Sequence, residues 1–192
     1  MKPSNLSPEL QAYLNNSSTQ SFIQTAKSYL TFCEQLVKTA PNPDILKEFH
    51  PLLVELYYCG SKLEPVPGQY PKEWQEFHEP DLVYEALLKY LIQCFGDDYR
   101  FFYLTDPESA LHDTHCLWPD EHLADIYLSL NDSLKRIETI ATPNEIHTGL
   151  AFLKRGYDEQ WGPDCAILLS TLHRRKLSFK LPPPSNFPFI PN

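Results

Sequence analysis

Apolar residues recur every three or four positions through most of this chain, the spacing that gathers side chains on one face of an α-helix. The pattern is clearest from residue 120 to residue 137, where six large side chains share one face. They are Leu123, Ile126, Tyr127, Leu130, Leu134 and Ile137. Similar stripes predict helices over residues 19–39, from Pro43 past Leu56, over 80–95, over 143–157 and around 165–172. We therefore expect an all-α fold.

Prolines and caps set the predicted helix boundaries. Asn42 is placed to cap a helix whose first turn holds Pro43, where the missing N–H does no harm. Pro51 interrupts that helix, and we expect a kink or a restart because its ring collides with the carbonyl four residues back. The run 142–145, Thr-Pro-Asn-Glu, is typical of a capping box at a helix start. Gly162 and Pro163 predict a break before the last helix.

Other segments lack this periodicity. Residues 60–79 and 107–119 are predicted to be two long loops, with a possible short turn near Trp74. Residues 97–106 are rich in aromatic side chains and fit either a short buried helix or an extended strand. Prolines at 182–184, 188 and 191 predict an extended, polyproline-like tail.

A chain of 192 residues suits one domain. We expect an N-terminal arm over residues 1–18 and a helical bundle over residues 19–176. The Pro-rich tail then covers residues 177–192. Short connections between the last three helices favour antiparallel neighbours, so the predicted architecture is an antiparallel bundle of six to seven helices.

The net charge of the chain makes some classes of binding partner less favourable than others. Sixteen Lys and Arg against 25 Asp and Glu give a net charge of −9, which disfavours nucleic acid. The basic run 173–176 closes the last predicted helix, where cations complement exposed carbonyls. No apolar stretch is long enough to cross a bilayer, and no signal peptide is recognisable. The five cysteines form no Cys-x-x-Cys pair, so we expect reduced thiols in the cytoplasm and no disulfide framework.

Several residue blocks resemble a known family. They are Leu123-Ala124-Asp125-Ile126-Tyr127 with Leu130, then Trp161-Gly162 and Leu172-His173, and upstream Tyr84 with Phe95-Gly96-Asp97-Asp98-Tyr99. Over residues 20–176 the chain resembles the bacterial family catalogued as domain of unknown function 5063 (DUF5063). The resemblance implies an all-helical fold and names no reaction. The chain departs from the family pattern at Ser129, where an aspartate is expected, at Gln160, where a histidine is frequent, and at Pro163-Asp164, where a basic pair is usual.

Potential metal ligands are densest between His112 and Asp125, where histidines, carboxylates and a thiol lie close in sequence. These groups bind zinc and other divalent metals. The zinc-protease pattern His-Glu-x-x-His is absent, as are the Glu-x-x-His pairs of di-metal bundles. We therefore predict no cofactor and keep as the alternative a divalent metal such as zinc, held by His115, Cys116, His122 and Asp125.

Four residues are the candidates for binding. Asp125 lies about 200° around its helix from Leu123 and so faces away from the apolar stripe. This carboxylate either pairs with a neighbouring helix or loop, or belongs to a binding surface, and His122 is close enough to share a hydrogen bond with it. Trp161 is expected to anchor the core with its N–H bonded to a backbone carbonyl. His173 is expected to lie half-buried at the edge of its helix's stripe.

No catalytic residue is assigned, because the sequence carries neither a Gly-x-Ser-x-Gly nucleophile turn nor a phosphate-binding loop. The leading hypothesis is a non-enzymatic protein-interaction module that binds another protein or a second copy of itself. Its basis is the outward Asp125 face, the aromatic segment over residues 99–103 and the apolar tail. The alternative is a metal-assisted hydrolase or small-molecule binder that uses the residues from His112 to Asp125.

Overall fold

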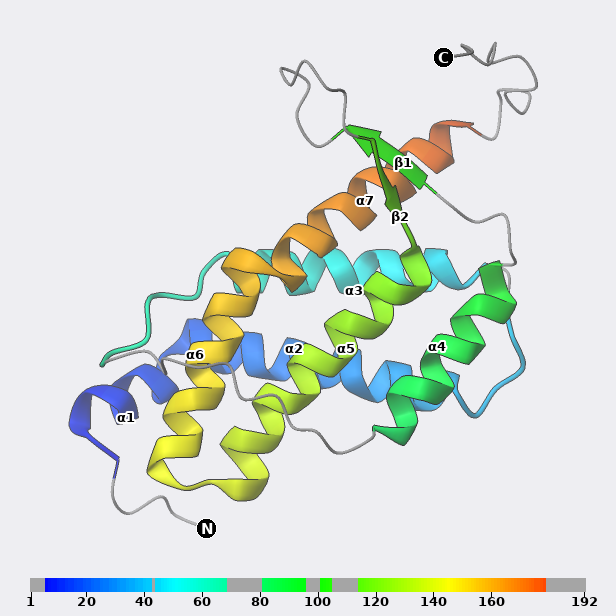
Figure 1. The fold of residues 1–192 in the computed structure, drawn as a ribbon. Helices are drawn as coiled ribbons and strands as arrows, with labels where there is room; N and C mark the ends of the chain where they lie inside the picture. The colour runs from blue at the N-terminus through cyan, green and yellow to red at the C-terminus, as the bar shows by residue number, and fades with distance from the viewer. Residues whose placement is uncertain (1–5, 43, 69–80, 96–100, 105–113, 179–192) are drawn as a thin grey trace.

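A computed structural model of the chain describes residues 6–42, 44–68, 81–95, 101–104 and 114–178. Within these ranges the chain forms seven α-helices, one π-helical turn and a hairpin of two short strands (Figure 1). The elements are α1 (Pro8–Asn15), α2 (Ser17–Leu36), α3 (Ile45–Gly60), α4 (Leu82–Phe95), β1 (Phe101–Leu104), β2 (Thr114–Leu117), α5 (Pro119–Lys135), η1 (Arg136–Ile140), α6 (Pro143–Glu159) and α7 (Trp161–Ser178). The predicted all-α bundle is confirmed, with one small hairpin added to it.

The aromatic segment forms an extended strand rather than a short buried helix. Residues 101–104 are extended and pair antiparallel with residues 114–117, Phe102 opposite Cys116 and Tyr103 opposite His115. The second half of the loop predicted over 107–119 therefore holds a strand. The possible turn near Trp74 and the tail beyond Ser178 lie outside the described residues.

Helix α1 occupies part of the predicted N-terminal arm. The Ser7 hydroxyl accepts a hydrogen bond from the Leu10 N–H at 3.2 Å, and Pro8 takes the first helical position. Asn16 is extended; it ends α1 and caps α2 by accepting from the Ser18 N–H at 2.9 Å. The sequence contains these capping residues, but a helix of two turns is too short to show a periodic apolar stripe.

Helix α3 runs without interruption through Pro51, so the restart considered there does not occur. Buried side chains lie on both sides of the proline, with Phe49 before it and Leu53 and Leu56 after it. They pack α3 against α2 and α7. This packing holds both halves in one helix despite the hydrogen bond that proline removes.

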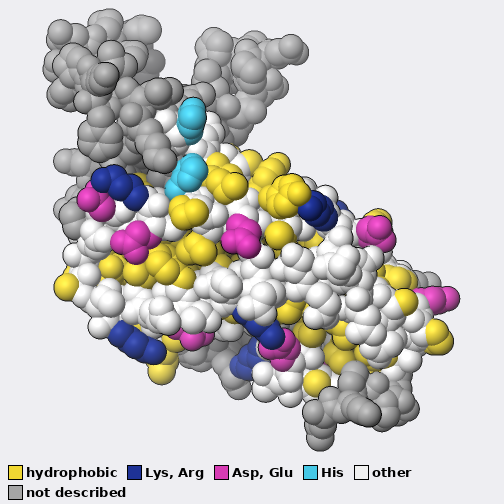
Figure 2. Space-filling view, turned by 180° about the vertical axis from the view of Figure 1, so that it is seen from behind, with side chains coloured by type: hydrophobic (Ala, Val, Ile, Leu, Met, Phe, Trp, Pro, Cys, Tyr) yellow, Lys and Arg dark blue, Asp and Glu magenta, His cyan; other side chains and the backbone are white. Residues whose placement is uncertain are grey.

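The core lies where α2, α3, α5, α6 and α7 meet, with α2 and α3 behind α5 and α6 in the view of Figure 1. The Tyr29 hydroxyl donates to the Leu123 carbonyl at 2.9 Å and ties α2 to α5. The Trp161 ring stacks on Phe22, with centroids 5.2 Å apart. Figure 2 shows the rear face, where hydrophobic side chains lie among charged ones; the exposed residues of α3 include Val54 and Tyr58.

The helix connections follow the predicted pattern in part. Helices α4 and α5 run antiparallel, as do α5 and α6 (Figure 1). The Thr142 cap is confirmed, since its hydroxyl accepts from the Glu145 N–H at 3.3 Å, while the Glu145 carboxylate accepts from Arg136 at 2.8 Å. Helix α7 instead leaves the end of α6 at an angle, because only Gln160 separates them. The break predicted at Gly162-Pro163 thus lies at Gln160, and both residues sit in the first turn of α7.

A buried cation fixes the turn between α5 and α6. Arg136, only 6% exposed, lies 2.8 Å from the Glu145 carboxylate and 3.5 Å from that of Asp132. The last turn of α5 widens here into the π-helical turn η1, which ends at Ala141 in the left-handed conformation with φ 51°. None of the helices described is both long and apolar enough to cross a membrane. Of the five cysteines, the four with described side chains are free.

Candidate functional site

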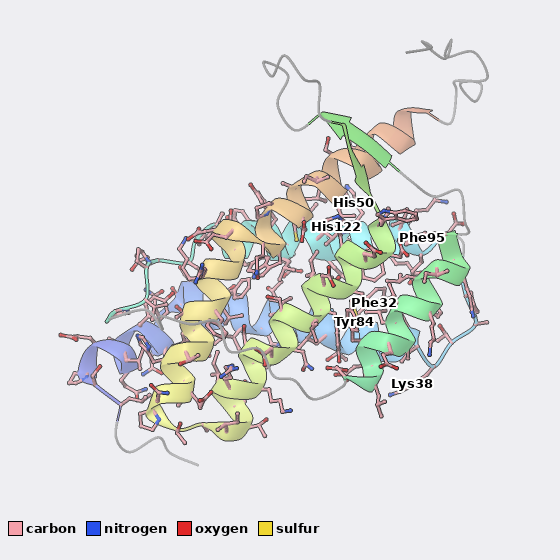
Figure 3. The ribbon with its side chains drawn as sticks, in the orientation of Figure 1. Phe32, Lys38, His50, Tyr84, Phe95 and His122 are labelled. Atoms are coloured by element: carbon pink, nitrogen blue, oxygen red, sulfur yellow. The ribbon has the colours of Figure 1, made fainter. Side chains whose placement is uncertain are left out.

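Five polar side chains from three helices gather near the start of α5. They are Tyr84 on α4, Glu121, His122 and Asp125 on α5, and Asp164 on α7, and we call them the α5 carboxylate cluster. In Figure 3, His122 lies near the start of α5 and Tyr84 lies on α4 where it faces α5.

The local sequence at the start of α4, α5 and α7 explains how these helices position the side chains of the cluster. Pro119 starts α5; Glu121 and Asp125 lie one turn apart on the side opposite the buried Leu123, and His122 lies beside them, half-buried. The Asp81 carboxylate caps α4 by accepting from the N–H groups of Val83 and Tyr84. Asp164 falls in the first turn of α7, where a carboxylate is stabilised by the helix dipole.

Two hydrogen bonds link the cluster across helices. The Tyr84 hydroxyl donates to Asp125 Oδ1 at 3.1 Å, which joins α4 to α5. His122 Nδ1 lies 2.8 Å from Asp164 Oδ1, which joins α5 to α7. The hydrogen bond considered between His122 and Asp125 is therefore replaced by two separate bonds, each to another helix. Asp125 is exposed, as its position on the helix predicted.

The environment shifts three pKa values upward. Burial opposes the charge on His122, but the hydrogen bond and negative charge of Asp164 outweigh it, so the pKa of His122 is raised. Partial burial raises the pKa of Asp125; the Tyr84 hydrogen bond and His122 act against it, while the charge of Asp164 adds to it. Partial burial and the nearby Asp125 raise the pKa of Tyr84 to about 12. The cluster is thus a place where negative charge is incompletely compensated.

The balance of charges supports this conclusion. The cluster holds three carboxylates and one imidazole, which is neutral or singly positive. Within the described part of the chain, neither Glu121 nor Asp125 forms an ion pair with a lysine or arginine. A cationic group brought to this surface would therefore meet two carboxylates, Glu121 and Asp125, that have no lysine or arginine partner among the described residues.

Trp161 anchors the core as predicted, at 1% exposure, but the predicted bond from its N–H is wrong. The indole Nε1 is buried and has no hydrogen-bond partner among the residues that the structure describes. Gly156 brings the α6 backbone against this atom, since a Cβ there would lie 2.5 Å from Nε1. The Gly156 carbonyl already accepts from the Gln160 N–H at 2.9 Å. Ser129 faces the same glycine, at a position where the family resemblance leads us to expect an aspartate.

The structure describes the remaining predicted residues only in part. His173 is exposed on α7 rather than half-buried, because the helix turns this position outward. His115 and Cys116 belong to β2, and their side chains, like residues 112 and 113, lie outside what the structure describes. Among the residues it does describe, no group of three or more His, Cys, Asp or Glu side chains is arranged to hold a metal ion.

Two members of the cluster were not predicted from the sequence. Tyr84 counted as part of the apolar stripe of α4, and nothing local to it indicates that its hydroxyl reaches α5. In the sequence, Asp164 stands out only as a departure from the family that the chain resembles, in which a basic residue is usual at this position. An acidic residue in place of a basic one is the feature of the sequence that could have indicated this member of the cluster, since its carboxylate pairs with His122.

Comparison with known proteins places the chain in a family. None of the curated proteins matches it. The crystal structure of protein BF1032 from Bacteroides fragilis is similar, with a TM-score of 0.60 and 18% sequence identity over 91% of this chain and 99% of the other. At that identity the likeness concerns the fold alone. A family model matches residues 14–178. The chain therefore belongs to the family described as domain of unknown function (DUF5063).

Proposed function

We propose that this chain is a non-enzymatic protein-interaction module that binds a partner through lysine or arginine side chains placed on the α5 carboxylate cluster. The observation that carries the proposal is Asp125, a carboxylate at the protein surface whose pKa is raised by partial burial and which has no lysine or arginine partner among the described residues. A cation bound beside it would favour its ionised form, so the partner gains binding energy from a charge that the free protein holds unfavourably.

A purely structural role explains less of the geometry. Leu123 and Ile126, on either side of Asp125, are fully buried and pack α5 into the core without help from the carboxylate. The bond from the Tyr84 hydroxyl needs an acceptor but not a negative charge. The surplus charge is therefore the feature that packing leaves unexplained, and charge on a surface acts mainly on partners.

Two of the four described thiols, Cys33 and Cys165, are unsuited to nucleophilic catalysis. The Cys33 and Cys165 thiols are buried, and burial raises the pKa of each. A thiol of raised pKa is a poor nucleophile, because the thiolate is the reactive form. Buried free cysteines also suit the reducing cytoplasm, which is where we propose that the module acts.

Affinity capture with two matched variants tests the proposal. Asp125→Asn removes one negative charge and keeps an oxygen that can accept from Tyr84. Glu55→Gln removes one negative charge from an exposed position on α3, outside the cluster. Tagged wild type and both variants are incubated with a lysate of the source organism, and bound proteins are eluted with salt and identified by mass spectrometry.

We expect a protein captured by wild type and by Glu55→Gln and lost with Asp125→Asn, and we expect purified partner to bind more weakly as salt increases. Equal capture by all three baits would contradict the proposal. If the recovered partner is a second copy of the chain, light scattering on the purified protein will show a dimer that Asp125→Asn weakens.

A further inference from the structure

The outer side of α3 carries a patch of exposed hydrophobic side chains. Val54 is 46%, Tyr57 37% and Tyr58 58% exposed, and Pro51, one turn before Val54, is exposed as well. Seven large hydrophobic side chains are exposed in the described part of the chain, and three of them lie within five consecutive residues here. We call these four residues the α3 apolar face; Figure 2 shows the rear of the molecule, to which α3 belongs. Such a concentration of hydrophobic surface marks a place where another segment binds.

Neighbouring side chains hold the two tyrosine rings of this face in place. The Tyr57 ring packs against the Tyr157 ring of α6, with centroids 5.6 Å apart, and the Lys62 ammonium lies 3.8 Å from the centre of the Tyr58 ring. Rings fixed in this way lose little conformational freedom when a ligand binds. Adjacent aromatic rings are the surface on which proteins bind proline-rich segments, because proline rings pack on them and the extended backbone offers its carbonyls to hydroxyl donors.

The chain's own tail has the composition that such a surface binds. Residues 179–192 contain five prolines, three phenylalanines, one leucine and one isoleucine, and they carry no carboxylate side chain. The run Pro188-Phe189-Ile190-Pro191 is entirely apolar. Proline-rich sequences favour the polyproline II conformation and so lose little conformational entropy on binding. The family model ends at residue 178, so this apolar segment follows the part of the chain that the family shares.

The tail is long enough to return to the α3 apolar face. Helix α7 packs on α3 and begins beside its last turn, where a Cβ on Gly60 would lie 2.7 Å from the Trp161 ring. From Trp161 to Ser178 the axis of α7 rises about 26 Å, so the tail starts about that far from the two tyrosines. A polyproline II chain advances about 3.1 Å per residue, so residues 179–187 span about 28 Å. Residues 188–191 can therefore meet the face.

We infer that residues 188–191 bind the α3 apolar face of the same molecule. Phe189 and Ile190 cover Val54, and the flanking prolines pack on the two tyrosine rings. Attachment to α7 gives the segment an effective concentration at the face on the order of millimolar, so a contact too weak to join separate molecules closes within one. The occupant is for this reason the chain's own tail rather than a second copy. The contact goes beyond the proposed protein-interaction role and does not depend on it, because the α5 carboxylate cluster lies on other helices.

Methyl NMR on the full chain tests the inference. The isoleucine methyl groups are labelled with carbon-13, and the Ile190 signal is identified by its loss in Ile190→Val. At a concentration where light scattering shows a monomer, we expect nuclear Overhauser effects from this methyl group to the ring protons of Tyr58, which are identified by their loss in Tyr58→Ser. A random-coil Ile190 shift without these effects would overturn the inference. Effects found only between labelled and unlabelled copies in a mixed sample would make a second copy the occupant and overturn it as well.

A matched pair of exposed hydrophobic residues provides the control. Val54→Ser alters the α3 apolar face at a side chain 46% exposed, and Ile92→Ser alters α4 at one 44% exposed. Chymotrypsin cleaves after phenylalanine, and proteolysis follows the unbound population. We expect cleavage after Phe189 to be about tenfold faster in Val54→Ser than in wild type and unchanged in Ile92→Ser. Circular dichroism confirms that both variants are folded. Equal cleavage rates in all three proteins would overturn the inference and leave the protein-interaction proposal untouched.

Discussion

The indole N–H of Trp161 has no acceptor within the described ranges, and this predicts which part of the side chain stabilises the fold. The ring is 1% exposed, stacks on Phe22 and meets Tyr157 edge-on with centroids 5.3 Å apart. Trp161→Ala removes all of these contacts and leaves a cavity, which costs about 4 kcal/mol. That is a large share of the 5–15 kcal/mol that holds a typical domain folded.

Trp161→Phe should behave very differently. Phenylalanine keeps a ring on Phe22 but loses volume, at a cost of about 1–2 kcal/mol. It also removes a buried donor without an acceptor, which relieves a penalty of about 1–3 kcal/mol. The two effects nearly cancel, so we expect Trp161→Phe to stay within about 1 kcal/mol of wild type.

Guanidinium chloride unfolding, followed by far-ultraviolet circular dichroism, measures both variants against wild type. The result that refutes the reasoning is a loss of about 3 kcal/mol or more in Trp161→Phe, similar to that in Trp161→Ala. Such a loss would mean that the indole N–H is bonded in the native protein and that its removal costs a hydrogen bond.

Three further predictions follow from the geometry. Gly162→Ala should destabilise the fold by about 3 kcal/mol or more in the same assay, because its Cβ would lie 2.0 Å from the Tyr157 carbonyl oxygen; a near-neutral effect would show that α7 can shift. Asp164→Asn should lose more stability near pH 6 than near pH 8. The pKa of His122 is raised in the folded protein, so the pairing of His122 with Asp164 contributes its full stabilisation below about pH 6.5, and this stabilisation is lost as the pH rises through the folded-state pKa. An equal loss at both pH values would contradict this. Elemental analysis of protein purified without chelators should show no stoichiometric transition metal; a metal that disappears in His122→Ala would support the metal-binding alternative instead.

The helical fold was predictable because its signals are local. The stripe from Leu123 to Ile137 and the capping box at Thr142 depend on residues a few positions apart, and the structure places helices at both. The errors arose where distant packing overrides local preference. Pro51 stays within α3 because buried residues on both sides hold the helix against α2 and α7, and no local rule contains that contribution.

The candidate site was predictable only in part, for the same reason. That Asp125 faces outward follows from helical geometry, and the structure agrees. Its bond to Tyr84 and the bond of His122 to Asp164 join residues about 40 positions apart, so they depend on how three helices pack. The acceptor for the Trp161 N–H was mispredicted because the close approach of Gly156 fixes which backbone atoms lie nearby.

The central claim is that a basic partner binds at the carboxylates around Asp125, and zero-length cross-linking tests it most directly. A carbodiimide joins a carboxylate to a lysine amine only when the two are in contact, so mass spectrometry of the cross-linked complex locates the partner's lysines. We predict cross-links to the α5 carboxylate cluster in wild type, with those at position 125 absent and total yield reduced in Asp125→Asn. Cross-links confined to carboxylates elsewhere, such as Glu9 or Glu55, with yield unchanged in Asp125→Asn, would contradict the account.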